Sequence, residues 1–503
     1  MNTVRTLQEY VVALRDAGIL TGCTVPEALL GRGVKCLTYD TRSLHENALF
    51  ICKGAHFKEE YLRDALSHGA FAYVAEQQHD VDAPCILVSD IRYSLVVLGQ
   101  LFYDHVTDKL TSIGITGTKG KSTTAYYVRY ILNDWLRAQD RNECAILSSI
   151  DNYDGKVSEE SHITTPEVLE LYQHFENAHE SGISHLVMEA SSQALKYGRV
   201  RGITFDVGAF LNIGSDHISP IEHPDFEDYF AAKLKIFDSC RVGCVNTDAK
   251  HADRVIEYAK DRCKLITFGS HESDTVSCRH VEKHEDGLYF TVVSPKYNGE
   301  FSITMPGLFN ISNALAAMAI CMALDVPEEY VRSGLRKARA AGRMQIYESR
   351  DKKITVIVDY AHNFASVNAL LDFVEQRYGA EHPHITLITG SAGNKAYDRR
   401  EGIVKAAQDR VQKLILTAED TDTEPIEQIC SEMANNVTNE DLDVQTILDR
   451  AEAVKHAVDE ARAADGGLSI LLLIGKGDEQ WIKDRNIHTP YEGDSQIIRR
   501  LFA

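Results

Sequence analysis

The chain has 503 residues, of which 44% are hydrophobic and 25% are charged. One hydrophobic core rarely serves a chain of this length, so we expect about three domains. The net charge of -21 at pH 7 argues against a surface that binds polyanions, and we expect neither nucleic acid nor an anionic membrane as a partner.

The cysteines and the apolar runs indicate the cellular location of the protein. Its 11 cysteines are scattered without a Cys-x-x-Cys pair, and many lie in apolar runs. Reduced, buried thiols are typical of a cytoplasmic protein. No apolar run approaches the roughly 20 residues of a membrane helix, and the segment after Arg5 is mixed rather than the apolar core of a secretory signal. We therefore expect a cytoplasmic protein without membrane insertion.

The first region, residues 1–108, alternates short strand-like runs with helical ones. The apolar runs 48–52 and 71–75 predict buried strands. The polar cluster 39–43 ends another strand, and the forked guanidinium of Arg42 suits a charged ligand. A surface turn with a local ion pair explains the same cluster equally well.

The second region, residues 109–340, opens with a strand that runs into the glycine-rich sequence 114–122. Its glycines let the backbone approach a polyphosphate, and the following helix presents unpaired N–H groups. Lys121 adds a positive charge, and Ser122 supplies a hydroxyl for magnesium. The strict Walker pattern requires glycine at Ile115, so the match is incomplete. A strand-to-helix turn that binds nothing is the alternative.

The alternation of strands and helices in this region is typical of a doubly wound, parallel α/β sheet. Ligands of such sheets collect beyond the carboxyl ends of the strands. Glu189 follows the strand-like run 185–188, and His217 follows the run 207–210. Beside the phosphate cradle, the two side chains can complete a magnesium site with Ser122. Taken singly, each is as readily explained as a strand-end cap.

The third region, residues 341–503, follows a helical run that we expect to stop at Gly342. A second strand–helix series predicts a Rossmann-like α/β domain. Its strands end in polar or glycine-rich loops, which would face the cradle across a cleft. These loops are 360–363, 390–395, 419–422 and 475–479.

The order of these motifs resembles the Mur ligase family over nearly the whole chain. Members of this family are ATP-dependent amide-bond synthetases of cell-wall precursor assembly, and their own variant of the phosphate loop matches the displaced glycine. The resemblance implies three α/β domains, with a central phosphate-loop domain. The matching motifs are 114–122, 189–192, 310–317, 342–343, 359–362 and 475–477.

The segments 164–167, 199–202 and 231–233 are most similar to the MurE branch, which adds the third amino acid to UDP-N-acetylmuramoyl-L-alanyl-D-glutamate. Pattern alone would place Lys233 on a solvated basic face. The resemblance implies instead that Lys233 is carbamoylated to N6-carboxylysine. The implied magnesium ligands are Ser122, Glu189, His217 and the modified Lys233, with Lys121, Glu189, His217 and Lys233 forming the catalytic set.

The resemblance also implies residues for each substrate. Those for ATP are Gly117, Thr118, Lys119, Gly120, Lys121, Ser122, Thr123, Asn310, Arg343, Asp359 and His362. Those for the UDP-linked substrate are Thr41, Arg42, Ser43, Thr164, Thr165, Ser192 and Arg199. Those for the incoming amino acid are Lys395, Arg399, Glu419, Asp420, Asp422 and Glu479. For Lys395 and Arg399, a solvated basic loop is the alternative.

One short motif indicates which amino acid is added. Branch members that use meso-diaminopimelate carry Asp-Asn-Pro-Arg, whose arginine binds the distal carboxylate. This chain has 419–422 as Glu-Asp-Thr-Asp, and Asp422 in the place of that arginine favours an ammonium. The loop 390–395 is also similar to the lysine-adding subgroup. We expect L-lysine, with meso-diaminopimelate and ornithine as alternatives.

Three departures from the family concern the acceptor pocket more than the ATP site. Asn363-Phe364 replaces Thr-Pro, the acidic motif lacks its proline, and Asp478 replaces a frequent histidine. Three other functions compete: a ligase like folylpolyglutamate synthetase, a P-loop kinase or ATPase, and a non-catalytic nucleotide-binding partner protein. A ligase like folylpolyglutamate synthetase would leave the N-terminal region unexplained. A P-loop kinase or ATPase would leave the C-terminal region unexplained. A non-catalytic partner protein would not explain why the whole catalytic set is present. We expect an active, monomeric ligase.

Overall fold

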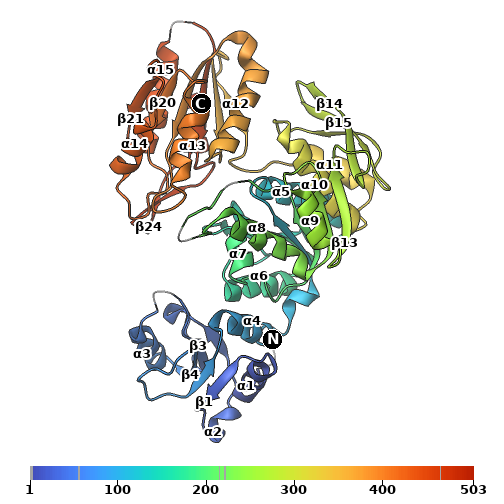
Figure 1. Cartoon of the computed structure of the whole chain (residues 1–503), viewed down its shortest axis with the longest axis vertical. Coiled ribbons are helices and arrows are strands. Elements are labelled where there is room, and N and C mark those ends of the chain that lie inside the picture. Colours follow the sequence, from blue (N-terminus) through green and yellow to red (C-terminus); the bar gives the residue numbers. More distant parts are fainter. Residues whose placement is uncertain (1–3, 55–56, 215, 220–221, 465, 486) are drawn as a thin grey trace.

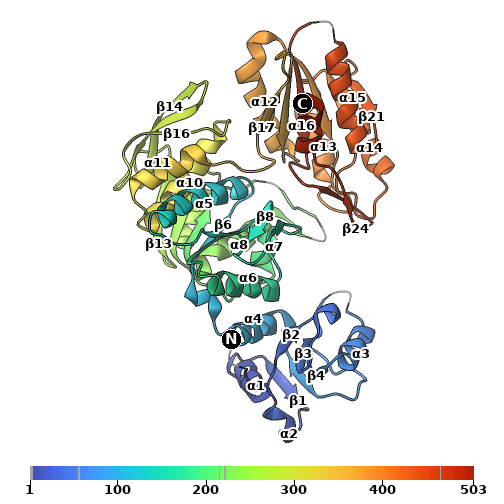
Figure 2. The ribbon, with the colours of Figure 1, turned by 180° about the vertical axis from the view of Figure 1, so that it is seen from behind.

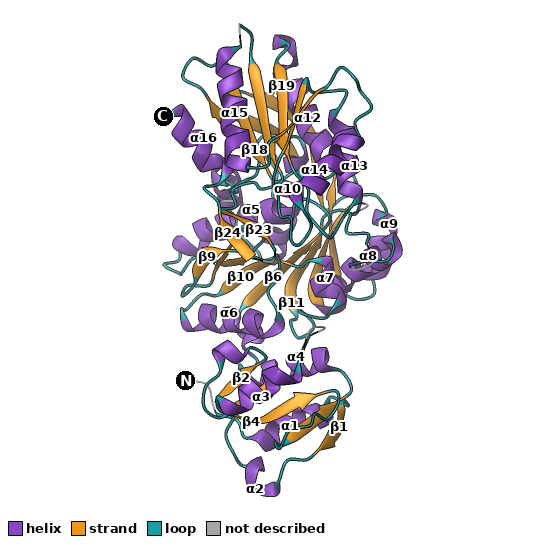
Figure 3. Cartoon of the chain, turned by 90° about the vertical axis from the view of Figure 1, so that its left-hand side faces the viewer, coloured by secondary structure: helices purple, strands orange, loops and turns teal. Residues whose placement is uncertain are grey.

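The computed structural model describes residues 4–54, 57–214, 216–219, 222–464, 466–485 and 487–503. Three α/β domains follow one another along the long axis, from the N-terminal domain (blue) to the C-terminal domain (orange to red) (Figures 1 and 2). Helices cover the sheet of each domain (Figure 3). Within these described ranges, no helix combines the length and apolar character needed to cross a membrane.

The N-terminal domain confirms the two strands predicted from its apolar runs, as β3 and β4. Its elements are α1 (Leu7–Asp16), β1 (Leu20–Cys23), α2 (Glu27–Leu30), β2 (Cys36–Thr38), η1 (Thr41–Ser43), β3 (Ala48–Ile51), α3 (Glu59–Ser67), β4 (Ala70–Ala75), β5 (Cys85–Val88), α4 (Ile91–Phe102) and η2 (Val106–Lys109). The strand order is β1-β5-β4-β3-β2, and only β1 pairs antiparallel among these strands. Every residue of β3 and β4 is buried, as their continuous apolar sequence requires.

The central domain is larger. Its elements are β6 (Thr111–Thr116), α5 (Lys121–Arg137), β7 (Ala145–Leu147), β8 (Asp151–Tyr153), β9 (Ser158–Glu160), α6 (Val168–Glu180), β10 (His185–Glu189), α7 (Ser192–Lys196), β11 (Phe205–Phe210), α8 (Phe226–Leu234), η3 (Lys235–Ser239), β12 (Cys240–Asn246), α9 (Ala252–Ala259), β13 (Lys264–Gly269), β14 (Val276–His284), β15 (Gly287–Val293), β16 (Gly299–Ile303), α10 (Phe309–Ala323) and α11 (Glu328–Lys337). The strand order is β16-β15-β14-β13-β12-β11-β6-β10-β7-β8-β9.

The predicted parallel sheet forms the middle of this order, from β14 to β7. Antiparallel strands extend it at both edges, β15 and β16 on one side and β8 and β9 on the other. The register places Glu189 beside Ile115 and Phe210 beside Thr116. The ends of β10, β6 and β11 therefore lie next to one another, and the loops that follow these strands lie at the same edge of the sheet.

The C-terminal domain has the predicted second α/β sheet, in the order β17-β18-β22-β19-β20-β21. All of its pairings are parallel except that of β17 with β18. A separate hairpin, β23 with β24, follows β22. The elements are β17 (Gln345–Glu348), β18 (Ile354–Asp359), α12 (Phe364–Tyr378), η4 (Gly379–Glu381), β19 (His384–Thr389), α13 (Asp398–Ala407), β20 (Lys413–Leu416), α14 (Ile426–Asn435), β21 (Asp443–Thr446), α15 (Arg450–Ala463), β22 (Ser469–Ile474), β23 (Trp481–Asp484), β24 (Ile487–Pro490) and α16 (Asp494–Phe502).

The predicted helix stop at Gly342 is wrong. The helix α11 ends at Lys337, and Ala338 already has a non-helical ψ of 137°. Gly342 serves a different purpose: its φ is +64°, and a Cβ there would collide with the backbone of Asp478. The glycine therefore permits a close approach between the interdomain connection and the loop after β22.

A buried ion pair ties α15 to α16. Arg450 and Asp494 are both fully buried, with Nη2 and Oδ2 at 2.6 Å, and Arg450 also donates to the carbonyl of Ile474 at 2.8 Å. Asp494→Ala would leave the guanidinium without its counter-charge, so we expect a loss of about 3–5 kcal/mol in the unfolding free energy of this domain. Calorimetry of the whole chain would measure it. The exposed pair Arg500–Glu492 is the matched control, and Glu492→Ala should cost less than about 1 kcal/mol. Equal effects of the two substitutions would contradict this account.

Candidate functional site

A cavity of about 610 Å³ lies between the central and C-terminal domains. Its walls combine the loop after β6, the ends of β10 and β11, and the loops after β18, β19, β20 and β22. Both halves of the predicted nucleotide site therefore face one space. The predicted residues that line it are Thr118, Lys119, Gly120, Lys121, Ser122, Thr123, Thr164, Glu189, His217, Asn310, Arg343, Asp359, His362, Lys395, Arg399, Glu419, Asp420 and Glu479.

The loop after β6 is held in a shape that requires glycine. Gly120 has φ +84°, and a Cβ there would collide with the Asn313 side chain. The Lys121 ammonium donates to the carbonyl of Gly117 at 3.0 Å and to that of Thr118 at 3.4 Å. Burial lowers the pKa of Lys121, with Glu189 opposing this effect. The amine is thus held against the loop on which a phosphate would rest.

Ser122 belongs to a hydroxyl and carboxylate network at the start of α5. Its Oγ lies 3.0 Å from Ser149 Oγ, and Arg343 Nη2 donates to both hydroxyls at 3.3 Å. The Glu189 carboxylate accepts the backbone N–H of Ser149 at 2.8 Å. Ser122 and Glu189 therefore present oxygen donors, which suit magnesium, on one wall of the cavity.

His217 is oriented by a carboxylate that the sequence did not single out. Its Nδ1 lies 2.9 Å from Glu222 Oε1, and Glu222 is buried. A histidine whose Nδ1 is bound in this way directs Nε2 toward a ligand. The described ranges hold no group of three or more His, Cys, Asp or Glu side chains arranged for a metal. The residues fit magnesium only as a mixed set of carboxylate, hydroxyl and imidazole.

Lys233 lies behind the phosphate loop and does not line the cavity itself. Its ammonium is buried, donates to the carbonyl of Gly117 at 2.9 Å, and lies 4.7 Å from the centre of the Tyr229 ring. Within the ranges that the structure describes, it has no carboxylate partner. Burial, followed by the charge of Lys121, holds the pKa of Lys233 well below its usual range.

Arg199, predicted for the UDP-linked substrate, is connected through Glu167 to the N-terminal domain. The Arg199 guanidinium donates to the carbonyl of Thr165 at 3.2 Å and pairs with Glu167 at 2.6 Å. Glu167 also pairs with Lys53 of the N-terminal domain. Thr164 alone of this predicted set reaches the cavity wall.

Other members of the predicted UDP-substrate set make local contacts and do not line the cavity. The Arg42 side chain is 89% exposed and pairs with Asp40 at 2.7 Å, as a local turn would. Ser192 Oγ lies 3.0 Å from His223 Nε2 and is buried. Thr41 and Ser43 flank Arg42 on η1, away from the cavity.

Asp216 joins the two walls of the cavity. Its carboxylate accepts Arg399 Nη2 at 2.9 Å and Asn363 Nδ2 at 3.0 Å, both from the C-terminal domain, and lies 3.5 Å from Lys119 Nζ. Burial alone would raise the pKa of Asp216, but Lys119 and Arg399 hold it well below its usual range. Burial lowers the pKa of His362, whose Nε2 lies 3.1 Å from Lys119 Nζ.

The part of the cavity wall formed by the loops after β20 and β22 carries acidic side chains, and we refer to it as the acidic end. Lys476 Nζ pairs with Asp420 at 2.8 Å and with Glu479, and lies 4.1 Å from the centre of the Trp481 ring. Burial raises the pKa of Glu479 to about 7. Glu419 is buried, and its Oε2 has no hydrogen-bond partner in the described part of the chain.

The structure does not bring Asp422 to this end of the cavity. Its carboxylate pairs with Lys483 of β23 at 2.6 Å, outside the cavity wall. The predicted contact of Asp422 with the acceptor therefore has no support in this geometry. The pairing with β23 turns the residue away, and local sequence does not reveal that hairpin.

Two family models match the chain: the Mur ligase middle domain over residues 115–321 and the Mur ligase, glutamate ligase domain over residues 342–477. The UDP-N-acetylmuramyl-tripeptide synthetase of Bifidobacterium longum is 43% identical, with 93% of this chain and 92% of that protein covered. The chain belongs to the Mur ligase family. It is accordingly an ATP-dependent ligase.

Further relatives of this Mur ligase carry more specific names. The UDP-N-acetylmuramoyl-L-alanyl-D-glutamate--L-lysine ligase of Enterococcus faecalis is 37% identical, with 94% of this chain and 92% of that protein covered. A solved UDP-N-acetylmuramoyl-L-alanyl-D-glutamate--2,6-diaminopimelate ligase covers 99% of both chains with a TM-score of 0.65 at 23% identity. That last likeness concerns the fold alone.

Sequence reasoning missed several residues of this Mur ligase site. Asp216 and Glu222 follow β11, where polar residues were expected, but nothing local shows that one faces Arg399 and the other His217. Lys476 was noted only as part of a glycine-rich motif. Its pairing with Asp420 spans 56 residues and depends on the tertiary fold.

Asp216 is expected to hold the domains together in solution. Asp216→Ala would leave Arg399 buried without its counter-charge and weaken the interface by on the order of 3 kcal/mol. Small-angle X-ray scattering should then give a larger radius of gyration. Asp372→Ala removes an exposed aspartate that pairs with Arg410 and should leave it unchanged. An unchanged radius of gyration in the Asp216 variant would show that other contacts are enough to hold the two domains together.

Proposed function

We propose that this Mur ligase joins L-lysine to the D-glutamate of UDP-N-acetylmuramoyl-L-alanyl-D-glutamate, using ATP, in peptidoglycan precursor synthesis. The observation that carries the choice of lysine is the acidic end of the cavity, where the buried Glu419 has an unpartnered oxygen. An ammonium can satisfy that oxygen, whereas the distal carboxylate of diaminopimelate would be repelled. The name of the Enterococcus faecalis relative supports the same acceptor.

The reaction needs ATP because a carboxylate is a poor acceptor for an amine. Transfer of the γ-phosphoryl group to the D-glutamate carboxylate gives ADP and an acyl phosphate. The amine of lysine then attacks the carbonyl carbon, the bond to phosphate breaks, and the amine loses a proton as the amide forms. Lys121 and Lys119 place positive charge beside the transferring phosphoryl group.

Ser122, Glu189, His217 and Lys233 are proposed to hold magnesium. When bound, the ion would neutralise charge on the phosphate oxygens. Lys233 qualifies only after carbamoylation, in which its neutral amine adds to carbon dioxide and releases a proton. Its burial without a carboxylate partner supports this modification, because the product replaces an unpaired cation with a carboxylate.

The interface of the two domains is proposed to exclude water from the acyl phosphate. Asp216, Arg399 and Asn363 link the walls of the cavity, and Trp481 closes its acidic end against His162 of the central domain, with ring centres 5.4 Å apart. Water would otherwise hydrolyse the intermediate. The domain limits 1–108, 109–340 and 341–503, the cytoplasmic location and the monomeric state also stay proposals.

An acceptor panel tests the function directly. The chain with ATP, magnesium, the UDP-dipeptide and single amino acids should release phosphate and give a heavier product with L-lysine. Phosphate release without a heavier product would contradict ligation. A product with meso-diaminopimelate or ornithine in place of lysine would contradict only the acceptor.

The acidic end can be tested within the same assay. Glu419→Gln should raise KM for lysine at least tenfold, because it removes charge from the acceptor pocket, while KM for ATP changes less than about twofold. Glu427→Gln, on the first turn of α14, is the control. Equal KM values for lysine in the two variants would remove Glu419 from the acceptor site.

The modification of Lys233 has its own signature. Lys233→Ala should lower kcat by at least about a hundredfold, since a ligand and a charge are lost, and short carboxylic acids should restore part of it. Lys264→Ala, at the exposed start of β13, is the control. Mass spectrometry at alkaline pH should show 44 Da on Lys233, the mass that carbon dioxide adds. Failure of rescue together with an unmodified lysine would contradict the carbamate.

A further inference from the structure

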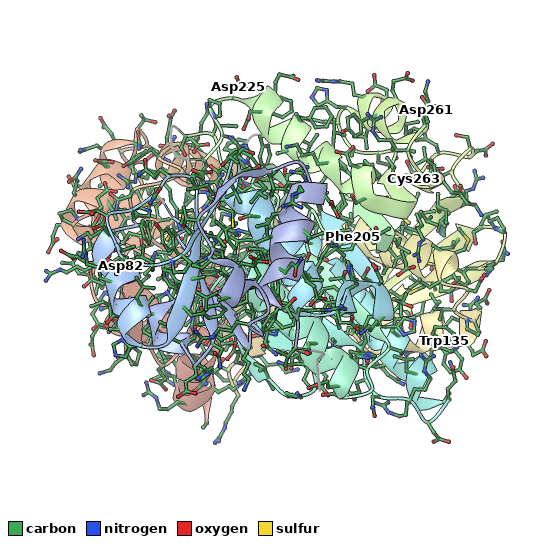
Figure 4. The ribbon with its side chains drawn as sticks, turned by 90° about the horizontal axis from the view of Figure 1, so that it is seen from below. Asp82, Trp135, Phe205, Asp225, Asp261 and Cys263 are labelled. Atoms are coloured by element: carbon green, nitrogen blue, oxygen red, sulfur yellow. The ribbon has the colours of Figure 1, made fainter. Side chains whose placement is uncertain are left out.

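A second cavity, of about 630 Å³, lies between the N-terminal and central domains. It is formed by the start of α4, the segment 195–201 that includes the end of α7, and η3. Phe205, labelled in Figure 4, contributes to its wall on the central domain. None of the residues discussed above for ATP, the dipeptide or lysine lines it.

Two reciprocal stacks cross this domain boundary. Arg92 of the N-terminal domain lies 4.3 Å from the centre of the Tyr197 ring of the central domain. Arg201 of the central domain lies 3.5 Å from the centre of the Tyr93 ring of the N-terminal domain. A guanidinium stacked on a ring is held in place while its N–H groups stay available at its edge.

Of the four cations in the wall of this cavity, Lys196 pairs with Asp228 at 2.7 Å, and the other three have no acidic partner among the described residues. Arg92, Arg201 and Lys235 form no ion pair with any residue that the structure describes. The two carboxylates in the wall are already engaged: Asp90 accepts the backbone N–H of Tyr93 at 2.9 Å, and Asp238 pairs with a guanidinium outside the cavity at 3.2 Å. In a chain of net charge -21, a cavity with unpaired cations from two domains is a local exception.

We propose that this cavity binds a small phosphate-bearing anion, held between Arg92 and Arg201 with Lys235 beside them. Planar guanidinium groups bind phosphate oxygens in a bidentate manner, and two of them fixed by stacking can act together. Because the arginines belong to different domains, the bound anion fixes the N-terminal domain against the central one. The class of ligand is a phosphate or pyrophosphate group other than that of the UDP-linked substrate.

The cavity is separate from the path of the UDP-linked substrate. Along the segment 198–202, Arg199 turns to Thr165 and Glu167, whereas Arg201 turns to Tyr93. The two arginines therefore serve opposite sides of the same turn.

Calorimetric titration of the full chain with sodium pyrophosphate, in buffer with EDTA, tests the proposal. The measurement is made in the Lys121→Ala background, which weakens the phosphate loop as a competing site. We expect saturable binding with one site, weakened at least tenfold by Arg92→Gln with Arg201→Gln. Arg377→Gln, which alters an arginine near Tyr378 in the C-terminal domain, should change nothing. Lys235→Gln leaves both stacks intact and should weaken binding about threefold, so the test stands if the double variant unfolds.

Binding that does not saturate, or that is equal in all these variants, would overturn the proposal. Loss of binding when the UDP-dipeptide is present at saturation would also overturn it, because the cavity would then belong to the substrate path. The titration needs no turnover, so its outcome is independent of the ligase assay. In that assay, the double variant in the native Lys121 background should keep KM for the UDP-dipeptide within about twofold.

Discussion

The arrangement of the site depends on the contacts of the buried Asp216 carboxylate. It is 2% exposed, yet it meets Arg399 and Asn363 from one domain and Lys119 from the other. Without this negative charge, Lys119 and Arg399 would face each other across the cavity at a high electrostatic cost. A polyphosphate on the loop of Lys119 supplies negative charge to the same cations. A nucleotide bound on this loop would therefore share partners with Asp216, and its binding would be linked to the fit between the domains.

The cavity wall carries charges of both signs. Lys119 and Lys121 come from the central domain, whereas Glu419 and Glu479 come from the C-terminal domain. Burial raises the pKa of Glu479 to about 7, so the negative charge on this part of the wall falls as the pH drops below neutrality. The overall charge of the chain says nothing of this pattern.

The sequence was most informative where one local rule decides the outcome. Strands of a parallel sheet end at one edge, and this rule predicts that Glu189 and His217 lie at the edge where β6 also ends. The requirement for glycine in the phosphate loop can also be predicted from the local sequence. Other features depend on packing between distant segments. They are the edge strands, the helix end at Lys337 and the pairing of Asp422 with Lys483. No periodicity in a short window carries that information.

Asn363 stands where the family usually has threonine, and its side chain makes two sets of contacts in this structure. Its Oδ1 accepts the N–H of Ser366 and caps α12, and its Nδ2 donates to Asp216. Threonine could cap the helix but has no second arm for the carboxylate. The departure thus adds a contact between the two domains that form the cavity wall.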